Sequence, residues 1–114
     1  MTQKWQNKLE TAAKELAKTE NLKLRSITFD KLKGKQGLCT NTGDIFIQLH
    51  KQRAMLEEVR QFHDVRTMSH ELAHLKHFHH REEFWAYQRE LCEKLGNLLN
   101  MTVNGSYSIA GDYN

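Results

Sequence analysis

The stretch Met68-Ser69-His70-Glu71-Leu72-Ala73-His74-Leu75 has the residue spacing of an amphipathic helix. Each residue of a helix advances by about 100° around the axis, so His70 and His74 point the same way, one turn apart. Glu71 falls at the edge of that face. The opposite side of the helix carries apolar residues, namely Val65, Met68, Leu72 and Leu75. The segment is therefore predicted to have one face with two imidazoles and one apolar face that packs on a sheet.

His70, Glu71 and His74 form the His-Glu-x-x-His pattern of zinc-dependent hydrolases. Two imidazoles on one side of a helix can share a metal ion, and the glutamate can reach a water on that ion without being a ligand. The alternative is a solvated helix face that carries stray histidines. The metal site is favoured because the motif lies on a regular amphipathic pattern and further histidines follow it closely.

A catalytic zinc ion usually takes three protein ligands and keeps one position open for water. His77 faces the same way as the motif, but along a continuous helix it lies about 10 Å from His70, too far to share one ion. The chain must therefore turn back before it offers a third ligand. In order of preference, the candidates are His80, a glutamate of the next helix (Glu90 or Glu93), and His79.

His80 ranks first because it follows His74 by six residues, the spacing of the His-Glu-x-x-His-x-x-Gly-x-x-His pattern. That pattern has glycine at a turn that needs a left-handed backbone, and His77 stands at this position here. Histidine tolerates a positive φ better than most other residues with a side chain. A turn at His77 is therefore expected to bring His80 back to the motif.

Three stretches together resemble a known family: Gly37-Leu38-Cys39 before a strand, His70-Glu71-Leu72-Ala73-His74, and His80 followed by Glu83-Phe84-Trp85. They are similar to the WLM and YgjP-type metallopeptidase domains, relatives of the SprT and Spartan proteases. The resemblance covers roughly residues 37–91, about half of the chain.

The resemblance implies a zinc peptidase with His70, His74 and His80 as ligands of Zn²⁺ and Glu71 as the general base. The WLM branch is associated with the degradation of proteins crosslinked to DNA. The implied partners are therefore a protein or peptide substrate and, as an activator, single-stranded DNA.

In the expected mechanism, zinc lowers the pKa of its bound water and polarises the scissile carbonyl. Glu71 takes the proton of the water and passes it to the leaving amine. The leading hypothesis is a compact zinc endopeptidase, with DNA-bound proteins among its expected substrates. Two rivals remain open: a metal-dependent hydrolase of a non-peptide substrate, and a latent or non-catalytic zinc-binding module.

The chain of 114 residues has the length of one domain. Residues 1–100 are predicted to form a minimal zincin-like domain, and residues 101–114 a polar tail. The tail is expected to be frayed. The alternatives are a methionine turn at Met101 and a segment that lies in the cleft as an inhibitor. No segment has the length of a membrane span, and the polar N-terminus argues against export. Cys39 and Cys92 are expected as reduced thiols in a cytoplasmic or nuclear monomer.

The net charge of +3 comes from both signs interspersed, which is compatible with nucleic acid but does not argue for it. The basic loop Lys31-Leu32-Lys33-Gly34-Lys35 is expected as a solvated turn. The alternative is a patch that contacts phosphates together with Lys23 and Arg25, and such contacts make binding steeply salt-dependent.

The predicted fold is α+β, with an N-terminal helix, a short antiparallel or mixed sheet, the active-site helix and a C-terminal helix. The expected elements are a helix over 4–19, a strand over 22–29, a hairpin of 37–41 with 44–50, a helical segment over 51–61 and a helix over 82–99. The segment 51–61 is either continuous with the active-site helix or broken near His63-Asp64. His63 and Arg66 are expected at the surface.

Two further expectations concern packing. The strand at 44–49 is assigned the sheet edge that pairs with an extended peptide, with an interior strand as the alternative. Trp85 is expected to pack beneath the metal site and Trp5 to anchor the core. The buried stripe of the last helix is predicted to consist of Phe84, Leu91, Leu95 and Leu98.

Overall fold

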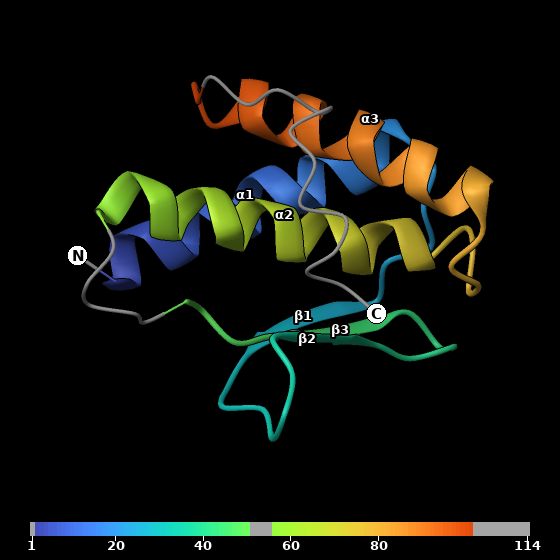
Figure 1. Ribbon diagram of the computed structural model, residues 1–114, viewed down its shortest axis with the longest axis horizontal. Coiled ribbons are helices and arrows are strands. Elements are labelled where there is room, and N and C mark those ends of the chain that lie inside the picture. The colour runs from blue at the N-terminus through green and yellow to red at the C-terminus, as the bar shows by residue number, and fades with distance from the viewer. Residues whose placement is uncertain (1, 51–55, 102–114) are drawn as a thin grey trace.

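The computed structural model describes residues 2–50 and 56–101 of the chain. Within these ranges it contains helices α1 (Thr2–Thr19), α2 (Glu57–His74) and α3 (Glu82–Leu98), and strands β1 (Ser26–Phe29), β2 (Gly37–Cys39) and β3 (Asp44–Ile47). In Figure 1, α2 lies between the small sheet and α3, and α1 packs against both α2 and α3. This arrangement confirms the predicted α+β, zincin-like fold.

The sheet has the strand order β1-β3-β2, so β3 is the central strand. It pairs in parallel with β1, from Ser26 opposite Asp44 onward, and antiparallel with β2, where Gly37 lies opposite Ile47. The edge role predicted for 44–49 is therefore wrong, because both sides of β3 are already hydrogen-bonded. The strand that lies at the sheet edge and contacts α2 is β2.

The turn between β2 and β3 confirms the hairpin expected around Thr42-Gly43. Gly43 has a φ of 94° and its N–H donates to the carbonyl of Thr40 at 3.2 Å. A Cβ at Gly43 would lie 2.5 Å from the carbonyl oxygen of Lys23, so this turn requires glycine on both counts. The turn thereby sets the register that places Gly37 and Cys39 beside α2.

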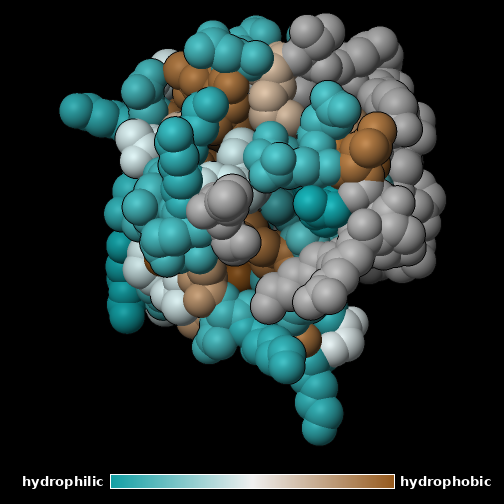
Figure 2. Space-filling view, turned by 90° about the vertical axis from the view of Figure 1, so that its left-hand side faces the viewer, coloured by the Kyte–Doolittle hydropathy of each residue, from teal (hydrophilic) through white to brown (hydrophobic). Residues whose placement is uncertain are grey.

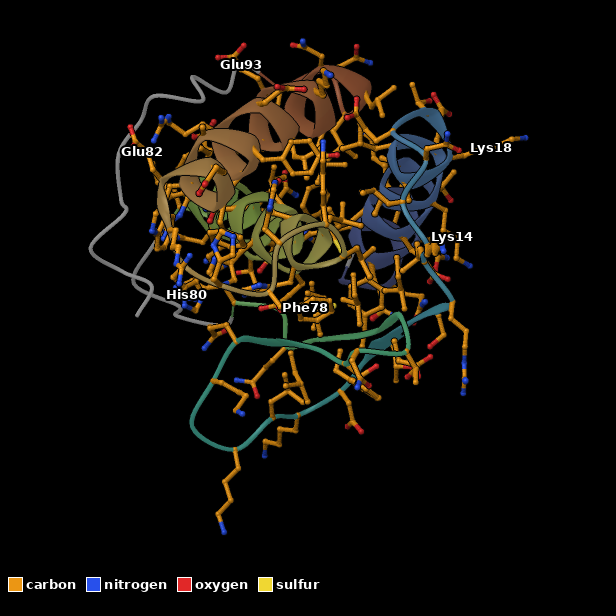
Figure 3. All side chains as sticks on the ribbon, turned by 90° about the vertical axis from the view of Figure 1, so that its right-hand side faces the viewer. Lys14, Lys18, Phe78, His80, Glu82 and Glu93 are labelled. Carbon is orange, nitrogen blue, oxygen red and sulfur yellow. The ribbon has the colours of Figure 1, made fainter. Side chains whose placement is uncertain are left out.

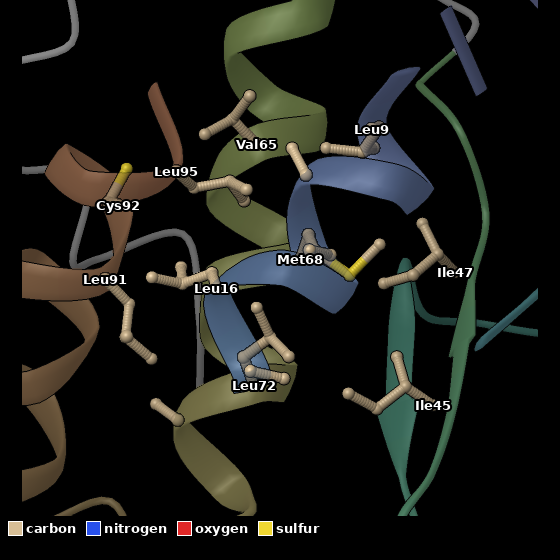
Figure 4. Packing of buried hydrophobic residues seen from close by; sticks show 14 of the residues in the cluster. Leu9, Leu16, Ile45, Ile47, Val65, Met68, Leu72, Leu91, Cys92 and Leu95 are labelled. Atoms are coloured by element: carbon tan, nitrogen blue, oxygen red, sulfur yellow. The ribbon is translucent and has the colours of Figure 1, made fainter. Parts of the chain in front are cut away.

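The hydrophobic core lies between the inner face of the sheet and the three helices (Figure 4). Ile45 and Ile47 are fully buried and alternate with half-buried Phe46, as predicted for a strand with one face on the core. The helices contribute the predicted apolar stripes. Their buried members include Leu9, Ala12, Ala13, Leu16, Val65, Met68, Leu72, Phe84, Leu91 and Leu95.

Leu98 is the exception to the predicted stripe of α3. It is 41% exposed, whereas Leu99 is 2% exposed. Both residues follow Leu95 at a spacing that suits one helical face, by three and by four positions. Asn100 adopts a φ of 57° and the N–H of Met101 donates to the Gly96 carbonyl at 2.8 Å, so the chain turns inward after α3 and carries Leu99 into the core.

The structure fixes two boundaries that matter for the predictions, the start of the first strand and the start of α2. The strand expected from residue 22 begins at Ser26. The N–H of Leu22 still donates to the Ala17 carbonyl of α1, and the N–H of Leu24 donates to the Leu22 carbonyl, so neither residue pairs with β3. α2 runs without a break from Glu57 to His74, so the later part of the segment 51–61 is continuous with the helix that carries His70 and His74. Residues 51–55 and the predicted tail beyond Met101 lie outside the described residues.

The face of the molecule shown in Figure 2 is mostly hydrophilic, with apolar patches between the polar side chains. None of the helices within residues 2–50 and 56–101 combines the length and the apolar character that a membrane span needs.

Candidate metal centre

Three imidazoles converge at the end of α2. His70 and His74 lie on its last turns, and His80 comes from the loop that leads to α3. One ring nitrogen from each residue can be chosen so that all three lie within 4.8 Å of one another. The ring centroids are 4.8 Å apart for His70 and His74, 5.3 Å for His70 and His80, and 4.9 Å for His74 and His80. The structure thus brings together the three residues that the sequence ranks first.

The lower-ranked candidates do not join this group. Glu90 accepts a hydrogen bond from the Lys94 ammonium at 2.8 Å, and Figure 3 shows Glu93 well apart from His80. The Nδ1 atom of His79 accepts the N–H of Arg81 at 3.0 Å. Among the described residues, the three-histidine group is the one set of side chains with the geometry of a metal site.

The loop before His80 is built without a left-handed residue. His77 does not adopt the positive φ expected of it. Instead, the N–H groups of Lys76 and His77 both donate to the Ala73 carbonyl, at 3.0 and 2.9 Å, which tightens the end of α2. The indole of Trp85 then donates to the His80 carbonyl at 2.9 Å and stacks on the His80 ring at 5.6 Å. Trp85 therefore packs at the centre, as predicted.

Each of the two imidazoles on α2 has a hydrogen-bond acceptor next to its Nδ1 atom, and this acceptor sets the orientation of the ring. The Nδ1 atom of His70 lies 2.9 Å from Oε1 of Gln88, and Nδ1 of His74 lies 2.9 Å from the backbone carbonyl of His77. A carbonyl oxygen only accepts hydrogen bonds, so each Nδ1 carries the proton and each Nε2 keeps a lone pair. This is the tautomer in which metal-binding histidines are held by neighbouring acceptors. The residues present therefore fit a metal ion.

The surroundings keep these rings neutral. Burial lowers the pKa of His70 to about 4, and burial also lowers the pKa of His74. Phe84 lies edge-on to His70 at 4.9 Å and stacks on His74 at 4.5 Å. Because a metal binds the neutral form of imidazole, this apolar wall favours binding at neutral pH.

Glu71 follows His70 on α2 and faces β2. It is 5% exposed, and its side chain packs against Gly37. Burial raises the pKa of Glu71 to about 8, with the charge of Lys35 opposing this shift. Burial and the charge of Glu71 raise the pKa of the nearby Cys39 thiol to about 12, so the thiol keeps its proton at neutral pH.

Gln88 is the residue at the centre that the sequence did not single out. It is 6% exposed and lies on the buried side of α3, between Phe84 and Leu91. A glutamine inside an apolar helical stripe requires a polar partner, and this pattern is the signal that could have identified it. The partner is the His70 ring.

Away from the metal centre, a buried polar side chain connects three parts of the chain. Asp64 on α2 accepts hydrogen bonds from the Trp5 indole at 2.9 Å and from the backbone N–H of His50 at 2.7 Å. Trp5 packs against the core, as predicted. His63 and Arg66, expected at the surface, are half-buried and 5% exposed respectively, because α2 has neighbours on more than one side.

The family model of the YgjP-like metallopeptidase domain matches residues 1–98. This match includes α1, which the motif stretches alone did not cover. No curated protein and no solved structure matches the chain. Since the family model spans most of the chain and the conformation of the three histidines suits a metal, the protein belongs to the YgjP-like metallopeptidase domain family.

Proposed function

We propose that the protein is a zinc-dependent endopeptidase in which His70, His74 and His80 hold the metal and Glu71 is the general base. The observation that carries this proposal is the convergence of three imidazole nitrogens within 4.8 Å, with the buried Glu71 next to His70 on the same helix. Three histidine ligands with one open position are typical of catalytic zinc. When bound, zinc supplies Lewis acidity, which lowers the pKa of water and polarises a carbonyl.

The chain itself supplies proton transfer and orientation. Glu71 accepts the proton of the attacking water and delivers it to the leaving amine. The carboxylate must be ionised to do so. Burial raises its pKa, whereas the positive charge of Lys35, and of a cation held by the histidines, lowers it. Gln88 and the His77 carbonyl keep His70 and His74 aimed at the centre.

The substrate of this proposal is an extended peptide at the outer edge of β2. This strand pairs with β3 on one side only within the described sheet, and it passes directly beside Glu71. A peptide that adds to it gains backbone hydrogen bonds and lies along the metal centre. The edge role assigned from sequence to 44–49 thus moves to Gly37–Cys39.

The proposal has a more specific second part: the substrates are DNA-bound proteins, and single-stranded DNA is an activator. A surface hollow of about 320 Å³ is lined by Lys14, Lys18 and Arg25 and offers cationic groups to phosphates. Figure 3 shows Lys14 and Lys18 on the side of the molecule away from His80. DNA at this hollow would tether a substrate without entering the site.

The test is a gel assay of proteolysis with zinc-loaded protein, with and without single-stranded DNA, and with Glu71→Gln as the matched variant. We expect cleavage that disappears in Glu71→Gln while one zinc per chain is retained. Cleavage that is equal with and without DNA would refute the activator role alone. Zinc binding with no cleavage of any protein would refute the endopeptidase, and ester and amide substrates would then separate a non-peptide hydrolase from a binding module.

A further inference from the structure

Gly37, the first residue of β2, lies directly against the carboxylate of Glu71. A Cβ placed on Gly37 would be 2.6 Å from Oε2, 2.9 Å from Cγ and 3.0 Å from Cδ of Glu71. Real Cβ atoms essentially never approach another heavy atom below 3.0 Å. With Glu71 in its observed position, any side chain at residue 37 therefore collides with it.

The backbone of Gly37 gives no other reason for glycine. The described glycines with positive φ are Gly34 and Gly43, whereas Gly37 pairs with Ile47 in the regular antiparallel register. Any residue can adopt that conformation, and most stabilise a strand better than glycine does. A glycine inside a strand often marks the close approach of another group, and here that group is the Glu71 side chain.

The position of the Glu71 carboxylate depends on packing. Its pKa is shifted by burial and by the charge of Lys35, and no described residue donates a hydrogen bond to it. A carboxylate that none of the described side chains holds takes the rotamer that its packing neighbours leave open. The space above Gly37 is the part of that environment contributed by β2.

We propose that Gly37 is a positioning residue for Glu71: the missing side chain leaves the space in which the carboxylate of the base stands beside the three histidines. This role in catalysis rests on the proposed function. A methyl group at residue 37 displaces the carboxylate while leaving His70, His74 and His80 untouched. A displacement of about 1 Å from the productive position can cost about 100-fold in rate.

The first measurement compares Gly37→Ala with wild type in the peptidase assay. We expect kcat to fall by about 100-fold, with KM and the bound zinc per chain unchanged. Thr28→Ala is the matched control, because it alters an exposed residue of β1, at the edge of the sheet away from β2. A merely structural role of Gly37 would lower zinc content or active fraction and leave kcat per folded molecule intact.

The second measurement is the thermal stability of metal-free protein. In the Glu71 background, Gly37→Ala is expected to lower Tm by about 5 °C or more, as overpacking does. Combined with Glu71→Ala, which removes every atom in the collision, Gly37→Ala is expected to leave Tm unchanged or raise it. Glutamine has the same shape as glutamate. In the Glu71→Gln background, Gly37→Ala is therefore expected to lower Tm by as much as it does with Glu71 present.

Two outcomes overturn the proposal: kcat of Gly37→Ala within threefold of wild type, or the same change in Tm with Glu71 and with alanine at that position. If the wild-type protein shows no cleavage that depends on Glu71, the proposed function fails. The Tm comparison then decides by itself whether Gly37 makes room for Glu71.

Discussion

Replacing Gln88 by leucine removes the acceptor that holds the His70 ring and changes the side-chain volume little. In the folded protein the Nδ1–H group of His70 is then buried beside an apolar group, since His70 is 6% exposed. A buried donor without an acceptor costs about 1–3 kcal/mol. The Gln88→Leu variant is therefore expected to be less stable than wild type by this amount in the absence of metal.

The same bond sets the expected loss of metal affinity. Removal of a residue that hydrogen-bonds a metal-binding histidine typically costs about 10- to 100-fold in affinity. This corresponds to about 1.4–2.7 kcal/mol, because each tenfold change in a dissociation constant is about 1.4 kcal/mol. The two values are separate measurements, because the first refers to folding of the metal-free protein and the second to binding of metal by the folded protein.

The assay is a zinc competition titration against a chromophoric chelator, with Gln61→Leu as the control. Gln61 is a half-buried glutamine near the start of α2 and is not at the metal centre. Gln88→Glu, which keeps an acceptor, is expected to bind zinc at least as tightly as wild type. Affinity of a folded Gln88→Leu variant within twofold of wild type would refute the reasoning. So would nitrogen NMR that finds the His70 proton on Nε2.

Two further predictions concern the third ligand and the buried aspartate. His80→Ala should weaken zinc binding by more than about 100-fold, beyond the loss of an outer partner, whereas Glu90→Ala should not change it; the reverse result in a titration would exclude His80. Burial raises the pKa of Asp64 to about 6, above its unfolded value of about 3.9. The folded state therefore holds this proton more tightly, so the contribution of Asp64 to stability falls as pH rises from about 4 to 6. Asp64→Asn should gain stability relative to wild type over that interval, by at most about 2.9 kcal/mol, and a Tm difference that is constant between pH 4 and 7 would contradict this.

The metal centre illustrates what local sequence can predict. The relation of His70 to His74 follows from the pitch of a single helix, and the six-residue spacing identified His80. The conformation of the loop between them was not predictable, because it depends on the Ala73 carbonyl and on the Trp85 indole, which belongs to the next helix. Spacing thus predicts which residues meet more reliably than how the backbone brings them together.

Gln88 and Gly37 show where the sequence is insufficient. Gln88 acts on His70 from 18 residues away, and Gly37 meets Glu71 only because β2 passes beside α2. The order of the strands is a similar case: the alternation of Ile45 and Ile47 predicts a strand with one buried face but does not say which strand is central. These features depend on tertiary contacts, which the spacing of residues along the chain does not predict.

His70 and His74 differ in whether a point mutation can remove the hydrogen-bond acceptor of the ring. The acceptor for His74 is the main-chain carbonyl of His77, which every amino acid at that position would supply. The acceptor for His70 is the side chain of Gln88, which a single codon change can delete. Within a family that diverges by point substitution, position 77 can vary freely in this respect, whereas a change at position 88 has to preserve an acceptor or be compensated elsewhere. The backbone thus supplies the acceptor for His74 whatever the sequence, whereas the acceptor for His70 depends on the residue at position 88.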